Sequence, residues 1–202
     1  MNERLFLEIN DLARATPWLH TPLAGYAAYG IVLFAVLLLA GWWSARASGT
    51  GMPAALWAPV GMLLAVAVNQ PIVAVVHDPR PYTTLPGILV LADRSSDPSF
   101  PSDHATMAGA VAAGLLLVNR RLGLLTVAAA AMMGFTRVYI GAHYPSDVLA
   151  GFAVGATVTL LGYLVARRPL AAGLRWSERT RLRPLLNPST GSASPEPAPT
   201  RR

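Results

Sequence analysis

The sequence predicts an all-α protein, a multi-pass transmembrane helical bundle of about five spans plus an N-terminal interfacial helix. Of its 202 residues, 53% are hydrophobic and only 13% are charged, whereas a soluble domain usually carries about 25% charged residues. Stretches such as Tyr29–Trp42 and Leu122–Gly134 contain no charged residue, and crossing a bilayer takes about 20 mostly apolar residues. The alternative, a soluble protein with an unusually apolar core, does not account for these stretches.

The first segment of the chain is amphipathic. Residues 3–14 place Leu5, Ile9 and Leu12 at helical spacing, with acids and arginines at other positions. This pattern predicts a short helix lying in the membrane interface. It is too charged for the apolar core of a signal peptide. We therefore expect residues 1–20 to form an N-terminal interfacial element.

Five apolar segments follow, and together they define a membrane domain over residues 21–168. The predicted spans lie near residues 22–43, 55–76, 104–119, 122–139 and 146–166. The third is short, so its outer end is expected to lie in a polar cavity lined by protein. Residues 169–202 are basic and rich in Pro, Ser and Thr. That composition does not build a core, and we expect this tail to be disordered.

The arginines indicate the orientation of the chain. Residues 167–202 contain eight arginines and two glutamates, which account for the whole net charge of +6. Nucleic-acid binding by the tail is one interpretation, but arginines beside an apolar span more often mark the cytoplasmic side. The inter-span arginines fall on that same side in a five-span chain: Arg46, Arg120, Arg121, Arg167 and Arg168. The tail is thus predicted to be cytoplasmic and the opposite loops extracytoplasmic.

The extracytoplasmic loops collect the residues that can carry chemistry. They contain the runs His77–Tyr82, Ser99–His104 and His143–Asp147, and the fourth predicted span ends at Thr136-Arg137. Ionisable groups at the end of a membrane bundle are costly and are functional candidates by default. The chain has no cysteine, which excludes disulfides, thiol catalysis and Cys-ligated metals.

Each of these groups has a physical role that fits phosphate chemistry. Ser102 is placed to cap a helix whose N-terminus would attract an anion. Arg80 and Arg137 can each donate a planar fork to phosphate oxygens. Asp147 lies four residues after His143 and can orient its imidazole, which makes His143 a nucleophile. A further histidine on another helix, His104, is free to protonate a leaving group.

Taken together, these residues resemble the signatures of the type-2 phosphatidic acid phosphatase superfamily. That family shows Lys-x6-Arg-Pro, Pro-Ser-Gly-His and Ser-Arg-x5-His-x3-Asp. The corresponding segments here are Val73-x6-Arg80-Pro81, Pro101-Ser102-Asp103-His104 and Thr136-Arg137-x5-His143-x3-Asp147. The likeness covers roughly residues 5–166. It implies a metal-free and cofactor-free site in which His143, His104 and Asp147 are catalytic, and Arg80, Arg137 and Ser102 bind phosphate.

Two departures from the signatures concern the phosphate site. Val73 replaces the lysine of the first signature, and His77, one turn further along, is a candidate substitute. Asp103 replaces the glycine of the second signature, where a carboxylate repels phosphate unless it points away or is protonated. His77 and Asp103 are therefore accessory candidates. The Pro-Ser-Asp-His form resembles the bacterial undecaprenyl-diphosphatase branch linked to bacitracin resistance, as does the reduced first span.

The resemblance implies a bacterial cell-membrane enzyme that hydrolyses undecaprenyl or another polyprenyl diphosphate to the monophosphate, through a phosphohistidine at the extracytoplasmic face. Its expected partners are the lipid substrate and membrane lipid, without nucleic acid. One alternative is a phosphatase for phosphatidic acid, phosphatidylglycerophosphate or another lipid phosphate. A second is a non-enzymatic lipid-phosphate binding protein, which would need the arginines but no nucleophile and acid.

Overall fold

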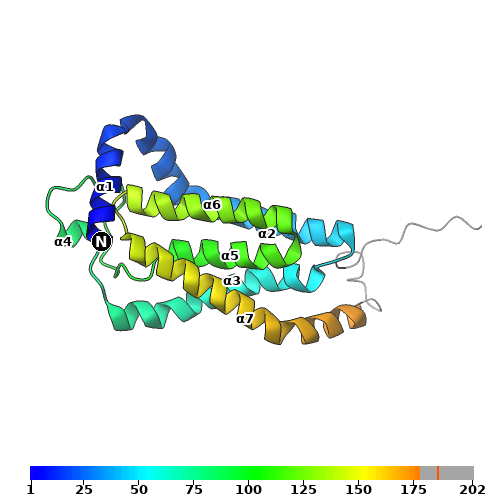
Figure 1. Cartoon of the computed structure of the whole chain (residues 1–202). Helices are drawn as coiled ribbons and strands as arrows, with labels where there is room; N and C mark the ends of the chain where they lie inside the picture. Colours follow the sequence, from blue (N-terminus) through cyan, green and yellow to red (C-terminus); the bar gives the residue numbers. More distant parts are fainter. Residues whose placement is uncertain (178–185, 187–202) are drawn as a thin grey trace, which may run out of the picture.

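Eight helical segments make up most of the chain in the computed structural model, which describes residues 1–177 and residue 186. Their bounds are α1 Asn2–Ala15, η1 Pro17–Leu19, α2 His20–Ser48, α3 Met52–Val76, α4 Pro81–Thr84, α5 Asp103–Val118, α6 Arg120–Tyr139 and α7 Pro145–Ser177. The described residues contain no strand. Figure 1 shows the five longer helices α2, α3, α5, α6 and α7 running side by side. The predicted all-α class is confirmed.

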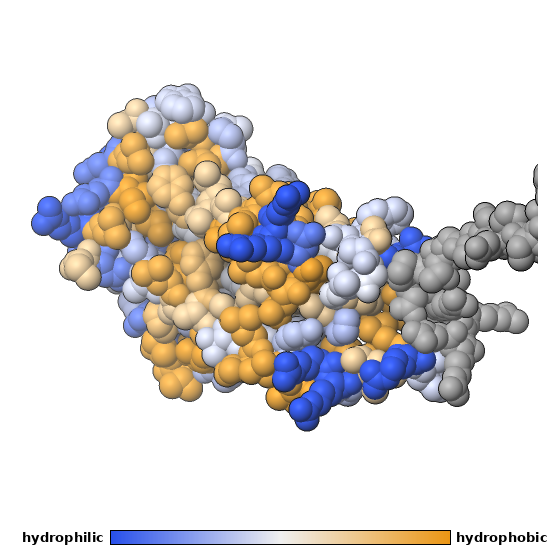
Figure 2. Space-filling view, turned by 45° about the vertical axis from the view of Figure 1, so that its right-hand side comes forward, coloured by the Kyte–Doolittle hydropathy of each residue, from blue (hydrophilic) through white to orange (hydrophobic). Residues whose placement is uncertain are grey.

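Each of the five predicted spans is a helix. The segments that contain α2, α3, α6 and α7 are long and apolar enough to cross a membrane. Large apolar side chains on them face outward, such as Leu39 at 66% and Leu63 at 64% exposure. Figure 2 shows the resulting apolar surface over the body of the molecule, flanked by hydrophilic residues. Such a surface suits the hydrocarbon of a bilayer, so the protein is a membrane protein.

The remaining span, α5, is the third along the chain and the central helix of the bundle. It has only 16 residues, and every residue from Ala105 to Leu115 is buried. It lies among α3, α6 and α7, and its neighbours shield it from lipid. A helix in this position can be shorter than the bilayer, because most of its length meets protein instead of hydrocarbon.

Small residues allow α7 to pack closely against α5. A Cβ atom at Gly151 would lie 2.6 Å from the carbonyl oxygen of Ser102. One turn later, a Cβ at Gly155 would overlap the carbonyl oxygen of Thr106 and lie 2.8 Å from the amide nitrogen of Ala110. Glycines four residues apart commonly let membrane helices approach backbone to backbone. This contact fixes the start of α5 beside the start of α7.

Helix α1 lies across the end of the bundle near the loops (Figure 1). Its inner face, Phe6, Asn10 and Ala13, is buried. Phe6 packs in a cluster with Ala105 of α5 and Val148 of α7. The charged residues of α1 are exposed, but Leu5 and Leu12 of the predicted apolar face are exposed as well, at 45% each, so the buried face is not the one that the sequence pattern indicated. The segment therefore shares the hydrophobic core of the bundle, and its contact with the membrane interface stays a prediction.

Helix α7 differs from the prediction at its C-terminal end. It continues to Ser177, whereas a disordered tail was expected from residue 169. Pro169 does not end the helix, and membrane helices tolerate such a proline when local adjustments satisfy the freed carbonyl. The residues after it are mainly Leu, Ala and Arg, which are good helix formers. The expectation of disorder was wrong for residues 169–177, and the remainder of the tail lies almost entirely outside the described residues.

The α5–α7 contact gives a stability prediction. Gly155→Ala is expected to destabilise the protein by about 1–3 kcal/mol, the usual cost of overpacking a filled core, because the new methyl group meets backbone atoms of α5. Gly173→Ala on the same helix is the control, since a Cβ there meets no atom within 4 Å. Thermal unfolding in detergent would measure both, and equal midpoints for the two variants would contradict the prediction.

Candidate active site

A cavity of about 680 Å³ opens where the loops meet at one end of the bundle. Six of the eight residues that the sequence singles out line it: His77, Arg80, Asp103, His104, Arg137 and His143. The other two, Ser102 and Asp147, are buried behind its wall at 0% and 2% exposure. Three segments far apart in the sequence thus converge on one cavity. The sequence analysis had placed all three at the same end of the bundle.

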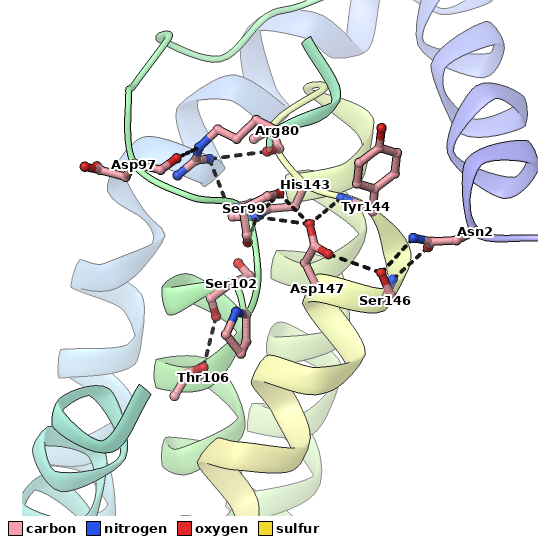
Figure 3. Close-up of polar contacts among 12 residues, drawn as sticks. Asn2, Arg80, Asp97, Ser99, Ser102, Thr106, His143, Tyr144, Ser146 and Asp147 are labelled. Atoms are coloured by element: carbon pink, nitrogen blue, oxygen red, sulfur yellow. Dashed lines mark hydrogen bonds and ion pairs between the residues drawn. The ribbon is translucent and has the colours of Figure 1, made fainter. Parts of the chain in front are cut away.

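The imidazole of His143 is held in one tautomer by the backbone. His143 is only 3% exposed and lies in the short loop between α6 and α7. Its Nδ1 atom is 2.8 Å from the carbonyl oxygen of Ser99 (Figure 3). Because a carbonyl oxygen only accepts hydrogen bonds, Nδ1 must carry the proton. The lone pair of the neutral ring is then on Nε2, which lies 3.4 Å from Nη1 of Arg80.

Asp147 stands close to His143 but not in direct hydrogen-bond contact with it. Its Oδ2 atom is 3.7 Å from Nδ1 of His143. The same oxygen accepts a 2.5 Å hydrogen bond from Oγ of Ser99 and a 2.8 Å hydrogen bond from the backbone N–H of Tyr144. The carboxylate thus places a negative charge beside the imidazole, while Ser99 occupies the direct hydrogen-bonding position that we expected for Asp147.

Ser99 is the site residue that the sequence reasoning missed. Its carbonyl fixes the tautomer of His143 and its hydroxyl holds Asp147. It is 0% exposed. The only signal for it in the sequence is its place three residues before Ser102, in a loop that already carried the candidates. A serine in a loop is so common that its type alone indicates no role.

The two arginines bring positive charge that no carboxylate neutralises among the described residues. Arg80 is held by backbone carbonyls, with Nε 2.8 Å from the oxygen of Asp97 and Nη1 3.3 Å from that of Ala142. The Nε atom of Arg137 is buried and has no hydrogen-bond partner in the described part of the chain. Guanidinium groups with unused donors at a cavity are suited to an anion such as phosphate.

The start of α5 adds a further anion-binding feature. Ser102 is its N-cap residue, and the backbone N–H of Ser102 donates to the carbonyl of Asp147 at 3.0 Å. The buried Oγ of Ser102 has no hydrogen-bond partner among the described residues. His104 follows in the first turn and lines the cavity. The free N–H groups of a helix N-terminus favour a negative charge at this point.

The two accessory candidates also reach the cavity. Oδ1 of Asp103 accepts hydrogen bonds from Nδ2 of Asn69 at 2.7 Å and from Nε2 of Gln70 at 3.0 Å. These amides of α3 tie the carboxylate to the wall of the cavity. His77 ends α3 with a φ angle of 53°, so it leaves the helical path yet still lines the cavity with Val73.

A second cavity reaches the same site from the side of α2. It has a volume of about 630 Å³ and shares His104 and Arg137 with the first. Its remaining wall comes from the start of α2, residues 91–93 and Ile140, and most of its α2 residues are small: Thr21, Ala24, Gly25, Ala27 and Ala28. The phosphate-binding groups therefore lie between a polar cavity and one with a largely apolar wall.

Burial determines the charge of His143. It lowers the pKa of the imidazole to about 4, the nearby Arg137 and Arg80 act in the same direction, and the interaction with Asp147 opposes them in part. The ring is consequently neutral at physiological pH, with a lone pair on Nε2. A neutral, oriented imidazole beside two arginines can act as a nucleophile toward a bound phosphoryl group.

Among the residues that the structure describes, no group of three or more His, Cys, Asp or Glu side chains is placed to hold a metal ion. The positive charge available to a bound anion comes from Arg80, Arg137 and the start of α5. A phosphate can be bound by these groups alone.

Comparisons with known proteins identify the family of the chain. Residues 54–170, which include all eight candidate residues, match the model of the PAP2 superfamily. The undecaprenyl-diphosphatase BcrC of Bacillus subtilis is 31% identical over 167 residues, 83% of this chain and 83% of that protein. The decaprenylphosphoryl-5-phosphoribose phosphatase of Mycobacterium tuberculosis is 43% identical over 104 residues, 51% of this chain and 56% of that protein.

A solved structure shares the arrangement of helices. The crystal structure of Aquifex aeolicus LpxE superimposes with a TM-score of 0.60 at 25% identity, over 79% of this chain and 93% of that one. The likeness therefore extends beyond the loops to the bundle that positions them.

The charge state of His143 gives a prediction about pH. The chain has only four histidines, so imidazole ¹⁵N NMR of histidine-labelled protein in detergent can follow each ring. Because its pKa is lowered to about 4, His143 is expected to keep the neutral Nδ1–H tautomer from pH 8 down to about pH 5 and to gain its second proton only below that range. The signal that disappears in His143→Asn assigns the residue, and a midpoint near its ordinary value would contradict the prediction.

Proposed function

The chain belongs to the PAP2 superfamily and is a membrane phosphatase, and from this premise we propose that it hydrolyses undecaprenyl or a similar polyprenyl diphosphate to the monophosphate at the extracytoplasmic face. The observation that carries the proposal is the state of His143. Its Nε2 lone pair faces Arg80 at 3.4 Å, on a cavity that also holds His104 and Arg137. A site that only binds phosphate needs the arginines but no oriented nucleophile.

In the first half of the proposed reaction, Arg80, Arg137 and the start of α5 hold the terminal phosphoryl group. Nε2 of His143 attacks phosphorus and forms a P–N bond, while the bond from phosphorus to the bridging oxygen breaks. His104 gives its proton to that oxygen, and the lipid monophosphate leaves. The imidazole ring becomes positively charged. Ser99 and Asp147 stabilise it, because one accepts its Nδ1–H and the other places a carboxylate 3.7 Å away.

In the second half, water attacks the phosphohistidine. His104, now neutral, accepts a proton from that water, the P–N bond breaks, and inorganic phosphate is released. His143 returns to its neutral tautomer, and the proton that His104 takes from water is the one that it gives to the leaving oxygen in the next turnover. The arginines and the helix terminus supply the charge stabilisation of both transition states. We therefore propose that the reaction needs neither a metal ion nor a cofactor.

Two features support a polyprenyl diphosphate as the substrate. One is the likeness to a relative named undecaprenyl-diphosphatase, which extends over 83% of both chains. The other is the pair of cavities that meet at His104 and Arg137. A diphosphate in the polar cavity can continue into the α2-side cavity, where small residues such as Ala24, Gly25 and Ala28 leave room for an isoprenoid chain.

A second lipid phosphate remains a specific candidate. The relative named decaprenylphosphoryl-5-phosphoribose phosphatase is 43% identical over the shared 104 residues, and its named substrate also carries a polyprenyl chain. Phosphatidic acid and phosphatidylglycerophosphate present the same terminal phosphate to the site. The choice among them depends on the fit of the leaving group and not on the phosphate-binding residues.

The orientation is proposed from the position of the arginines. Arg46 at the end of α2, Arg120 and Arg121 at the start of α6, and Arg167 and Arg168 in the distal part of α7 lie toward the end of the bundle opposite the cavity. Basic residues next to spans favour the cytoplasmic side. The cavity and its loops then face the outside of the bacterial cell membrane, with the C-terminal tail in the cytoplasm.

Substrate and mechanism are tested together by phosphate release from purified polyprenyl diphosphates, decaprenylphosphoryl-5-phosphoribose, phosphatidic acid and phosphatidylglycerophosphate, with EDTA present throughout. We expect the highest kcat/KM for the polyprenyl diphosphate. His143→Ala should reduce turnover of every substrate by at least about 10³-fold, because it removes the nucleophile.

The control for folding is His143→Asn, a closer match in size, judged by its unfolding midpoint and expected to be equally inactive. Normal turnover by a folded His143 variant would remove the proposed mechanism. Loss of wild-type activity in EDTA that returns with a divalent cation would remove the metal-free reaction. A higher kcat/KM for a glycerolipid would reassign the substrate.

The orientation has its own test, which the absence of cysteine makes simple. Single cysteines at the exposed positions Ser96 and Ala47 report the cavity end and the opposite end. A membrane-impermeant maleimide added to intact spheroplasts is expected to label Ser96→Cys directly and Ala47→Cys only after permeabilisation, because the reagent does not cross the bilayer. Direct labelling of Ala47→Cys with protection of Ser96→Cys would invert the topology.

A further inference from the structure

We propose that helix α1 is a positioning element of the active site, and that it acts on the carboxylate of Asp147 through Asn2 and Ser146. We call these three residues the α1 relay. The inference rests on the proposed function, because it assigns a role within that reaction. None of the residues that line the main cavity comes from α1, so any effect of α1 on the chemistry must pass through other residues.

The relay begins with a two-way contact between Asn2 and Ser146. Nδ2 of Asn2 donates to Oγ of Ser146 at 2.7 Å, and the backbone N–H of Ser146 donates to Oδ1 of Asn2 at 3.0 Å. The residues are 144 positions apart in the sequence. Two hydrogen bonds in opposite directions fix both the position and the rotation of the amide group, because its nitrogen and its oxygen are held at the same time.

The hydroxyl of Ser146 passes this constraint to the catalytic carboxylate. Oγ of Ser146 donates to Oδ1 of Asp147 at 3.1 Å (Figure 3). A hydroxyl has one proton to donate. Since Asn2 supplies a donor to Oγ of Ser146, the serine proton is turned away from Asn2 and toward the carboxylate. Asn2 thereby orients a hydrogen bond in which it takes no direct part.

The geometry of Asp147 explains why this hydrogen bond affects the reaction. Its Oδ2 atom is held by Ser99 and Tyr144 on the side of His143, whereas Oδ1 is held by Ser146. Bonds on both oxygens prevent rotation of the carboxylate. If Oδ1 is released, the group can turn and move its negative charge away from the imidazole, which becomes positive when His143 carries the phosphoryl group.

The rest of α1 holds the relay in place. Asn10 is 2% exposed and forms another two-way contact, with Nδ2 2.7 Å from the carbonyl of Leu89 and Oδ1 2.9 Å from its backbone nitrogen. The Phe6 ring packs edge-on against Tyr144, with centroids 5.4 Å apart. A buried amide that both donates to and accepts from the same backbone residue helps to fix one docking geometry. Helix α1 is thus seated beside both the residue that follows His143 and the residue that precedes Asp147.

The experiment is a double-mutant cycle on a polyprenyl diphosphate with Asn2→Ala, Ser146→Ala and the double variant. Each single variant is expected to lower kcat by about threefold to tenfold, the effect of one neutral hydrogen bond, with KM within about twofold. The double variant should match Ser146→Ala, because residues in one network are not additive. Ser146→Thr keeps the hydroxyl and should restore kcat.

Two further measurements separate positioning from loss of stability. Arg4→Ala is the matched control on α1, since it removes the exposed ion pair between Arg4 and Glu8, and it should leave kcat unchanged. The ¹⁵N imidazole signal of His143 should move in Asn2→Ala and Ser146→Ala but not in Ser146→Thr or Arg4→Ala. Because this NMR signal is measured without substrate, it tests the relay even if the purified protein hydrolyses none of the lipids supplied.

The outcomes distinguish this inference from the proposed function. Any of three results would overturn the relay. The first is that the effects of Asn2→Ala and Ser146→Ala on kcat multiply in the double variant. The second is a wild-type kcat with an unmoved His143 signal in Asn2→Ala, and the third is a Ser146→Thr variant as slow as Ser146→Ala. In those cases wild-type turnover and its loss in His143→Ala still support the phosphatase. A His143 signal that moves as expected in a protein that hydrolyses no lipid phosphate would support the relay and remove the proposed function.

Discussion

The hydrogen bond from Nδ1 of His143 to the carbonyl of Ser99 is the constraint on which the candidate active site depends. The two ring nitrogens of a neutral imidazole compete for one proton, and a backbone carbonyl decides the outcome without the energetic cost of burying another charge. With the proton fixed on Nδ1, the lone pair on Nε2 is left to the cavity. The arginines, the helix terminus and Asp147 then act on a nucleophile whose direction is already set.

This constraint in turn depends on the packing of α5. Ser99 precedes that helix and His143 precedes α7, so their contact survives only if the two helices start side by side. Close approach at Gly151 and Gly155 provides this alignment. The hydrogen bond from the backbone N–H of Ser102 to the carbonyl of Asp147 also holds the two helix starts together. The glycine-lined contact between α5 and α7 is therefore part of the chemistry, because larger side chains at Gly151 and Gly155 would separate the loops.

Sequence reasoning reached the bundle and most of the residues on the cavity, because apolar segments and the spacing of His, Arg and Asp are local patterns. It did not reach Ser99, the amides of Asn69 and Gln70 that hold Asp103, or the contact between Asn2 and Ser146. Those depend on partners 33 to 144 positions away, and common polar residues carry no sign of such partners. The length of α7 was underestimated for another reason: Pro169 is a local signal for an ending, and the helix continues past it.

The unneutralised arginines have a consequence for folding equilibria. Arg80 and Arg137 repel each other, and Nε of Arg137 is buried without a hydrogen-bond partner among the described residues. An anion that binds there relieves both penalties in the native state only, so its binding free energy adds to the free energy of unfolding, by about 2.7 kcal/mol at a concentration 100 times its dissociation constant. Inorganic phosphate, sulfate or a lipid headgroup would thus stabilise the folded protein, and its unfolding temperature would depend on the buffer in which it is kept.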